Sequence, residues 1–354
     1  MAYNSIRPGQ EWLDTNGNPI QAHGASIIFA DGKFYWYGEN KEKSTGDTER
    51  WSDGKIWHWG MRCYSSTDLY NWTDEGLILP PNPDDENDPM HPSQWADRPH
   101  IIYNEKTKKY VLWVKIMGKD GVQYMIISTA DFVTGPYTTI RKIRPCGLSS
   151  GDFDLVSDPV TKRGYIYFER VHSDMICADL TDDYTDVVGF YTAHFPHAHP
   201  PYVREAPAYF ERGGNKYLFT SGTTDYFPNP SEVAISKHYH GEWHVLGDPH
   251  VNDSRHTSFD SQISSVFKHP YKKDLYIALA DRWLTDLPDE RPDIEAMFDA
   301  LFTPDFDVPA MQATLHKLTK RNTSKARYVW LPVKFDGDMP TIEWLDKWRI
   351  EDYE

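Results

Sequence analysis

Five polar residues stand at similar intervals along the chain, each at the start of a short apolar run. They are His23, Asp97, Asp152, Glu205 and Gln262, separated by 74, 55, 53 and 57 residues. An isolated acid before a strand is usually a solvated turn residue. If the fold brings the three acids together, like charge and loss of hydration raise the pKa of at least one of them. Such a group can donate a proton, so the pattern predicts acid catalysis at a shared site.

The elements that would position these residues are β-hairpins of aromatic and β-branched residues. The pattern recurs in SIIFADGKFYWYGE, HIIYNEKTKKYVLWVK, DLVSDPVTKRGYIYFER, AYFERGGNKYLFTSG and SSVFKHPYKKDLYIALAD. A third and often a fourth short strand follow most hairpins, and turns such as RGGNK fit hairpin geometry. Four strands in each of five units predict an all-β, five-bladed β-propeller, whose first strands surround the axis. A β-sandwich or two small β-domains is the alternative.

One segment breaks the strand pattern. Residues 285–324 contain DIEAMFDALF and PAMQATLHKLTK, in which apolar residues recur at helical spacing. Strand-like sequence resumes afterwards, so we predict a helical insertion in the fifth blade of a single catalytic domain, residues 1–354. Two irregular segments, 41–58 and 80–96, are predicted rims of a pocket. Their aromatic and histidine residues are Trp51, Trp57, His58, His91 and Trp95.

Composition narrows the ligand class and the compartment. The net charge is −16 and Lys and Arg are scattered, which argues against nucleic acid and an anionic membrane surface as partners. No apolar run approaches the roughly 18 residues of a membrane span, and the N-terminus lacks an apolar signal region. We therefore expect a cytoplasmic protein, or a secreted one if a signal peptide has been removed. The oligomeric state is left open.

Cysteine usage and motifs exclude several kinds of chemistry. Cys63, Cys146 and Cys177 lack metal-ligand spacing, so we expect reduced thiols. The chain contains no nucleophile elbow, phosphate loop or nucleotide fingerprint, and no cofactor is expected to be required. Paired carboxylates in a chain with 14% aromatic residues favour an oligosaccharide substrate. In glycoside hydrolysis one carboxylic acid protonates the leaving oxygen, and a second group activates water.

The sequence resembles glycoside hydrolase family 43, a family of five-bladed propellers, and within it the branch of exo-β-1,3-galactanases. The matching stretches, from about residue 13 to 348, are DTNGNPIQAHGASI, GKFYWYGENK, RCYSSTDLYNW, DRPHIIYNEKTKKYVLW, SSGDFDL, REAPAYFERGGNKYLFTSG, SFDSQ, ADRW and RYVWLPVKF. The resemblance implies an inverting, exo-acting hydrolase, with terminal β-1,3-linked galactose as the expected sugar. A β-D-galactofuranosidase, an α-L-arabinofuranosidase and a non-catalytic glycan-binding propeller are the alternatives.

The resemblance also implies the catalytic roles. Glu205 in REAP matches the general acid, and Asp152 in SGD matches the acid that orients it and raises its pKa. Where the family typically has a general-base Asp, this chain reads IQAHGAS, with no carboxylate. Gln262 in FDSQ matches a residue thought to hold the attacking water. Asp97 or Glu39 acting through a water, and assistance by the substrate, are alternatives for the base.

Further residues are expected to bind the substrate on the same basis. They are Gln21, His23, Glu39, Asp97, Tyr124, Asp225, Arg282 and Trp283. The alternative for each acid is an ion pair, Glu39 with Lys41 and Asp97 with Arg98. The alternative for Tyr124, Arg282 and Trp283 is packing within the blades.

Two points bear on the environment of the site. Alternation along the strand predicts that Arg204 faces away from Glu205, because a nearby cation would lower the pKa of the acid. Some relatives hold a central cation, so a structural calcium or sodium ion in the channel, with water held by His256, is considered beside a hydrogen-bonded structural role for that histidine. Departures from the galactanase pattern, such as AHGAS, TTDYFPN and the helical insertion, leave the sugar open.

Overall fold

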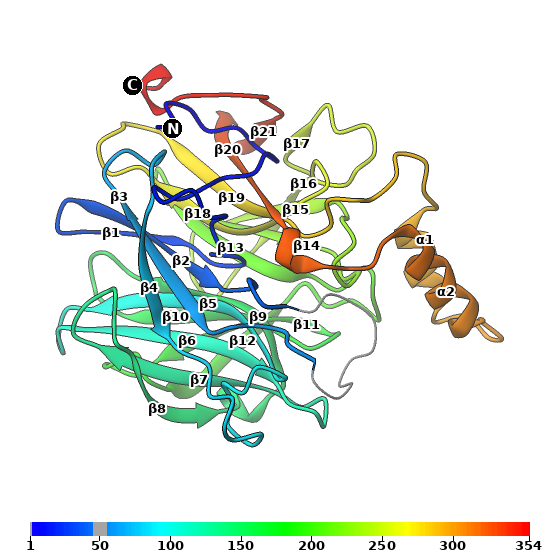
Figure 1. Cartoon of the computed structure of the whole chain (residues 1–354), viewed down its shortest axis with the longest axis horizontal. Coiled ribbons are helices and arrows are strands. Elements are labelled where there is room, and N and C mark those ends of the chain that lie inside the picture. Colours follow the sequence, from blue (N-terminus) through cyan, green and yellow to red (C-terminus); the bar gives the residue numbers. More distant parts are fainter. Residues whose placement is uncertain (1, 45–54) are drawn as a thin grey trace.

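Antiparallel sheets make up most of the molecule (Figure 1). The computed structural model describes residues 2–44 and 55–354. The first sheet contains β1 (Ile27–Ala30), β2 (Lys33–Glu39), β3 (Met61–Ser66) and β4 (Thr73–Leu79). The second contains β5 (Trp95–Asn104), β6 (Lys109–Met117), β7 (Gln123–Ala130) and β8 (Thr138–Ile143). The third contains β9 (Ser150–Ser157), β10 (Gly164–Arg170), β11 (Asp174–Leu180) and β12 (Val187–His194).

The remaining two sheets complete a ring. The fourth contains β13 (Glu205–Arg212), β14 (Asn215–Ser221), β15 (Ser231–Ser236) and β16 (His244–Gly247). The fifth contains β18 (Gln262–Lys268), β19 (Tyr276–Arg282), β20 (Arg327–Asp336) and β21 (Met339–Glu343), with β17 (His250–Val251) parallel to β21. Strands β5, β9, β13 and β18 contact one another in that order. The chain is a five-bladed β-propeller, which confirms the predicted fold class.

Local sequence explains how the hairpins turn. Arg212 pairs with Asn215 across the turn between β13 and β14, and the two residues between them are Gly213 and Gly214. Their φ angles of +60° and +78° lie in the left-handed region that a tight two-residue hairpin requires. Glycine adopts this region without steric cost, so the predicted RGGNK turn forms.

The ring closes between the fifth and first blades. Ser264 of β18 donates a hydrogen bond from Oγ to the carbonyl of Ala25 at 2.9 Å. The two ends of the chain lie side by side in Figure 1, and Ile6 forms a bridge with Trp348. Trp36 packs within an aromatic cluster beneath this bridge. Closure therefore combines backbone pairing with a buried aromatic core.

The helical insertion lies between β19 and β20, as predicted. It contains α1 (Ile294–Ala300), α2 (Val308–Leu318) and the 3-10 turn η2 (Thr323–Lys325). Asp293 and Asp307 cap the two helices through their side chains. Figure 1 shows both helices projecting from one side of the propeller. Two further 3-10 turns are η1 (Pro145–Gly147) and η3 (Ile350–Asp352).

Residues of the two predicted rim segments either pack in the interior or line a cavity. Trp57 and Trp95 pack edge to face, with ring centroids 4.3 Å apart, and Trp95 also lines a cavity that Asp97, Asp152 and Glu205 share. His58 is fully buried, and its Nε2 lies 3.2 Å from the carbonyl of His91. His58 is therefore a structural residue beneath the rim. Trp51 lies outside the described residues.

The cysteines are free thiols. Cys63 and Cys177 are buried and Cys146 is half-buried. In the described part of the chain, neither of the α-helices is long and apolar enough to cross a membrane.

Candidate active site

A cavity of about 280 Å³ opens where the inner strands of four blades begin. Asp97 and Asp152 are the third residues of β5 and β9, and Glu205 and Gln262 are the first residues of β13 and β18. All four line the cavity, together with Glu39, Asp225 and Trp283. The propeller thus brings four of the five equivalent positions together. The fifth, His23, does not line the cavity.

β-bulges shape the starts of these strands. The register of β5 shifts between Asp97 and His100, and that of β13 shifts between Glu205 and Ala208. A proline stands two residues after each acid, where a residue without an N–H fits an interrupted ladder. Arg98 lies in the bulge of β5 with a φ of +50°. Bulges re-aim side chains, and this one turns a buried arginine toward the cavity.

The environments of Glu205 and Asp152 push their pKa values apart. Burial raises the pKa of Glu205 well above its usual range, and the charge of Asp152 raises it further. Burial alone would raise the pKa of Asp152 too, but Arg98 and Lys115 outweigh it and lower the value to about 2. Glu205 therefore keeps its proton to a higher pH than Asp152 does. Such a pair can divide the roles of acid and charged neighbour.

Arg204 faces away from the acid, as the alternation of the strand predicts. Its Nε donates to Oγ1 of Thr220 at 3.0 Å, and its Nη2 donates to the carbonyl of the same residue at 3.0 Å. The cations that act against the raised pKa of Glu205 are Arg98 and Lys115.

Two cations hold Asp152 in place. Nζ of Lys115 donates to Oδ1 of Asp152 at 3.0 Å, and Nη2 of Arg98 lies 3.2 Å from Oδ2. Lys115 also lies 3.5 Å from Oδ2 of Asp97. Burial would raise the pKa of Asp97, but Lys115 and Lys41 lower it. Asp97 and Asp152 are therefore each paired with two cations.

The amide of Gln262 has four partners. Oε1 accepts from Nη2 of Arg98 and from the indole N–H of Trp283, the latter at 3.2 Å. Nε2 donates to Oε1 of Glu205 at 3.0 Å and to Oγ of Ser221 at 2.9 Å. Both lone pairs and both N–H bonds of the amide are thus used.

Glu39 and Lys41 form a buried pair beside Asp97. Nζ of Lys41 lies 2.8 Å from Oε2 of Glu39 and 3.5 Å from Oδ1 of Asp97. Oε1 of Glu39 accepts from the backbone N–H of Arg98 at 2.9 Å. The pairing of Glu39 with Lys41 is thus present, and Glu39 lines the cavity as well.

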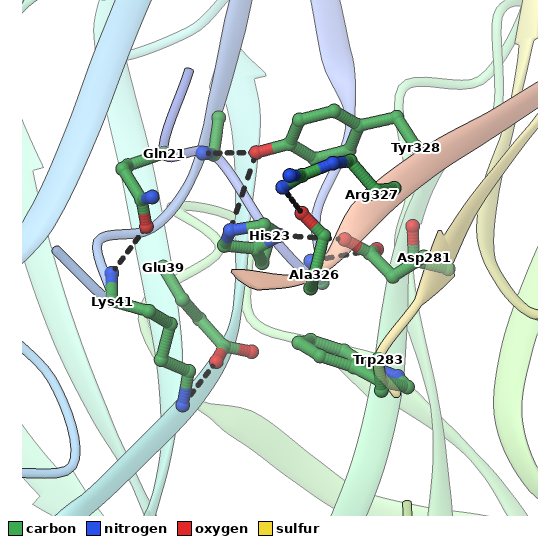
Figure 2. Close-up of polar contacts among 12 residues, drawn as sticks. Gln21, His23, Glu39, Lys41, Asp281, Trp283, Ala326, Arg327 and Tyr328 are labelled. Atoms are coloured by element: carbon green, nitrogen blue, oxygen red, sulfur yellow. Dashed lines mark hydrogen bonds and ion pairs between the residues drawn. The ribbon is translucent and has the colours of Figure 1, made fainter. Parts of the chain in front are cut away.

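Gln21 and His23 do not line the cavity. Figure 2 shows His23 between Tyr328 and Asp281; its Nδ1 lies 3.0 Å from Oδ1 of Asp281, and its ring stacks on Tyr328. Gln21 accepts from the backbone N–H of Lys41 at 3.1 Å. His23 is fully buried among these partners. The prediction that it contacts the substrate is therefore wrong, and its role is to support neighbouring residues.

Tyr124 and Arg282 also do not line the cavity. Tyr124 is buried in an apolar cluster that the first and second blades share, and Nζ of Lys142 lies 3.8 Å from its ring centre. Arg282 donates from Nη2 to the carbonyl of Phe259 at 2.7 Å and lies over the ring of Trp344. Both side chains are held by packing within or between strands, so the alternative of a packing role holds for each.

Trp283 and Asp225 lie at the cavity where the insertion meets the propeller. Trp283 contacts Tyr226 edge to face at 5.5 Å and packs in the apolar core of the insertion. Asp225 forms an ion pair with Arg321. Both predicted substrate contacts therefore line the cavity and also secure the insertion.

Several lining residues were missed in the sequence. Lys115 interrupts the apolar run of β6, KYVLWVKIM, and a lone lysine in a buried strand is a signal of a functional position. The sequence indicates Arg98 only as an ion-pair partner of Asp97. Phe298, Leu301 and Phe302 of the insertion gave no signal beyond helical periodicity, because only the fold places them at the cavity.

The structural cation considered for the channel would need ligands other than a cluster of acidic, histidine or cysteine side chains. Within residues 2–44 and 55–354, no three His, Cys, Asp or Glu side chains are grouped to hold a metal ion. The side chain of His256 is 71% exposed, and its Nδ1 lies 3.6 Å from Asp248. Its position at the surface does not fit a role in the channel.

The family model of glycosyl hydrolases family 43 matches residues 16–283. The chain belongs to glycosyl hydrolase family 43. The predicted family is thereby confirmed, and with it the class of enzyme, a glycoside hydrolase. Among functionally curated proteins, none shows a significant sequence match to the chain.

Solved structures of the family resemble the chain along nearly its whole length. The β-1,3-galactosidase BT3683, solved with galactodeoxynojirimycin, is 27% identical with a TM-score of 0.79, and the match covers 98% of this chain and 100% of that one. The β-1,3-galactosidase BT0265 has the same identity and TM-score, and the match covers 99% of this chain but 65% of that longer one. The exo-β-1,3-galactanase of Phanerochaete chrysosporium, solved with galactose, is 25% identical with a TM-score of 0.76, covering 98% and 68%.

Proposed function

We propose that this family 43 enzyme is an inverting, exo-acting glycoside hydrolase that releases terminal β-1,3-linked galactose from oligosaccharides. The observation that carries the chemistry is the pairing of Glu205 with Asp152. Loss of hydration raises the pKa of the first carboxyl, and two cations lower the pKa of its neighbour. The names of the similar structures, β-1,3-galactosidases and exo-β-1,3-galactanases, supply the proposed sugar and linkage.

Glu205 acts as the general acid in this proposal. Its proton passes to the glycosidic oxygen as the bond to the sugar breaks, so that the leaving group departs as a neutral alcohol. Asp152 keeps the proton on Glu205 before the reaction because its negative charge raises the pKa of that acid. Arg98 and Lys115 in turn keep Asp152 ionised.

Gln262 is the proposed partner of the attacking water, since no carboxylate stands at the place where the family usually has its base. An amide takes up no proton, so the proton that this water loses as it attacks the anomeric carbon passes through a second water to Asp97 or Glu39, which line the cavity. Its four hydrogen-bonding positions are filled, so it can hold water only after the substrate displaces one partner. Ser221 is the partner that can be exchanged without disturbing the charged groups. Glu39, Asp97, Asp225 and Trp283 remain the proposed contacts for the sugar hydroxyls and ring.

A substrate panel tests this function. The enzyme is incubated with β-1,3-galactobiose, aryl β-D-galactopyranoside, aryl β-D-galactofuranoside and aryl α-L-arabinofuranoside. We expect hydrolysis of the two galactopyranosides, with inversion at the anomeric carbon in product NMR. Activity confined to a furanoside would reject the proposed sugar, and retention would reject the single displacement. Binding of galactobiose without hydrolysis of any substrate would identify a glycan-binding protein.

A further inference from the structure

The insertion supplies an apolar wall to the cavity that holds the acid. This wall consists of Phe298 in α1 and of Leu301 and Phe302 at its end, and all three line the same cavity as Glu205. Phe298 and Leu301 are partly buried against the core of the insertion, whereas the side chain of Phe302 is 51% exposed. The wall therefore combines two partly buried apolar side chains with one exposed aromatic ring.

The loop between β12 and β13 meets the insertion at this wall. The ring of His199 stacks on Phe302, with centroids 4.2 Å apart and an interplanar angle of 20°. Pro200 lines the cavity beside it and stands five residues before Glu205 in the chain. The segment that leads directly to the acid thus also lines the cavity, beside the apolar wall.

The wall is held firmly against the propeller. Ile294, Met311 and Leu315 bury their side chains in one cluster with Trp283. Arg291 of the insertion binds Asp260 just before β18, and its side chain is only 8% exposed. A surface fixed by a buried core and an ion pair is preorganised to bind a ligand at little entropic cost.

The chemistry of the acid decides which part of a substrate this wall meets. Glu205 must face the glycosidic oxygen, which joins the released sugar to the leaving group. The charged groups on the inner strands, Asp97 and Asp152 among them, suit the hydroxyls of the released sugar. The leaving group lies on the other side of that oxygen, and the cavity lining that comes from the insertion consists of the apolar wall, beside His172, Thr223 and Tyr226 of the propeller. Pyranose rings have apolar C–H faces that pack on aromatic rings.

We propose that this wall is the leaving-group subsite and that it binds the second pyranose of the substrate by its apolar face. The inference rests on the proposed function, because it assumes that Glu205 protonates a galactosidic oxygen. It specifies the substrate class: at least a disaccharide, whose penultimate sugar stacks on Phe302.

Phe302→Ala tests the subsite, because its exposed ring can be removed without opening the core. The ratio of kcat/KM for β-1,3-galactobiose to kcat/KM for β-D-galactosyl fluoride is measured, since the fluoride carries the same sugar and no leaving-group ring. We expect this ratio to fall about five- to tenfold, as the loss of one aromatic contact implies. Phe132→Ala, which removes a ring that is 69% exposed on the second blade, is the control and should leave the ratio unchanged.

The outcomes separate the two proposals. If wild-type enzyme hydrolyses both substrates and Phe302→Ala leaves their ratio unchanged, the subsite is overturned and the proposed function stands. If the ratio falls for phenyl β-D-galactoside but not for galactobiose, the wall binds an aromatic aglycone and the pyranose assignment is overturned. If wild-type enzyme hydrolyses neither galactobiose nor the fluoride, the proposed function fails and the inference falls with it.

Discussion

Nε2 of Gln262 donates a hydrogen bond to Oε1 of Glu205 at 3.0 Å. The direction of this bond is fixed by the other side of the amide, since the arginine and indole groups that contact Oε1 of Gln262 can only donate. Oε1 of Glu205 therefore serves as an acceptor, and the acid proton belongs on Oε2. Gln262 thus orients Glu205, the proposed general acid, in addition to its own proposed role with water.

Gln262→Ala should lower kcat/KM for galactobiose by about 10²-fold, because displacement of a catalytic group by about 1 Å has an effect of this size. The variant leaves the N–H groups of Arg98 and Trp283 without this acceptor, which costs about 1–3 kcal/mol of folding free energy. Kinetics and urea denaturation measure the two effects. Unfolding at 25 °C would make Gln262 a structural residue, and full activity would remove it from the site.

Glu205→Gln should lower kcat on aryl galactosides with poor leaving groups roughly 10²- to 10⁴-fold, because the amide cannot donate the acid proton. The loss should be much smaller with a dinitrophenyl leaving group, which departs without protonation. Exposed Glu290 provides the control, and Glu290→Gln should retain wild-type rates. Equal losses with both leaving groups would contradict general acid catalysis by Glu205.

Asp152→Asn should move the alkaline limb of the pH–rate profile to lower pH. Burial raises the pKa of Glu205 first, and the charge of Asp152 raises it further. Removal of that charge lowers the pKa, so Glu205 loses its proton at a lower pH. The profile of kcat/KM reports this group in the free enzyme. An alkaline limb at the wild-type pH would show that the two carboxyls are not coupled.

The sequence predicted the blades correctly but not all of the residues that surround Glu205. Hairpin patterns and turn residues such as Gly213 and Gly214 depend on local rules, and they predicted the propeller and its insertion. The equivalent positions at the strand starts predicted four cavity residues. The prediction that His23 lines the cavity was wrong because its imidazole bonds to Asp281, which is 258 residues away in the chain. Long-range pairing of this kind has no local signature, and the same holds for the contact of Phe302 with His199.

Lys41→Met should destabilise the fold by about 3–5 kcal/mol, because it leaves the buried carboxylate of Glu39 without its cation. The pair is 2.8 Å apart, and both side chains are almost fully buried. Lys334→Met removes the cation of an exposed pair with Glu343 and should cost less than about 1 kcal/mol. Urea denaturation measures both. Adding Glu39→Gln to Lys41→Met should restore part of the loss, and equal costs for the two single variants would contradict this assignment.

His58 should make the fold less stable in mild acid. Burial and, after it, the charge of Lys41 lower its pKa to about 4. Nδ1 accepts from the N–H of Gly60 at 3.0 Å, a bond that a protonated ring cannot make. Between about pH 6.5 and 4 the unfolded chain binds a proton that the folded chain does not. The free energy of unfolding therefore decreases by about 3 kcal/mol as the pH is lowered through this range.

The measurement is the free energy of unfolding across that pH range for wild type and His58→Gln. The variant should be less stable near neutral pH but should show a shallower decline toward pH 4. His100, whose burial lowers its pKa to about 3, continues to titrate in the unfolded chain, so the decline is reduced rather than abolished. Exposed His256 gives the matched control, and His256→Gln should keep the wild-type slope. Parallel curves for wild type and His58→Gln would mean that His58 is already protonated in the folded protein.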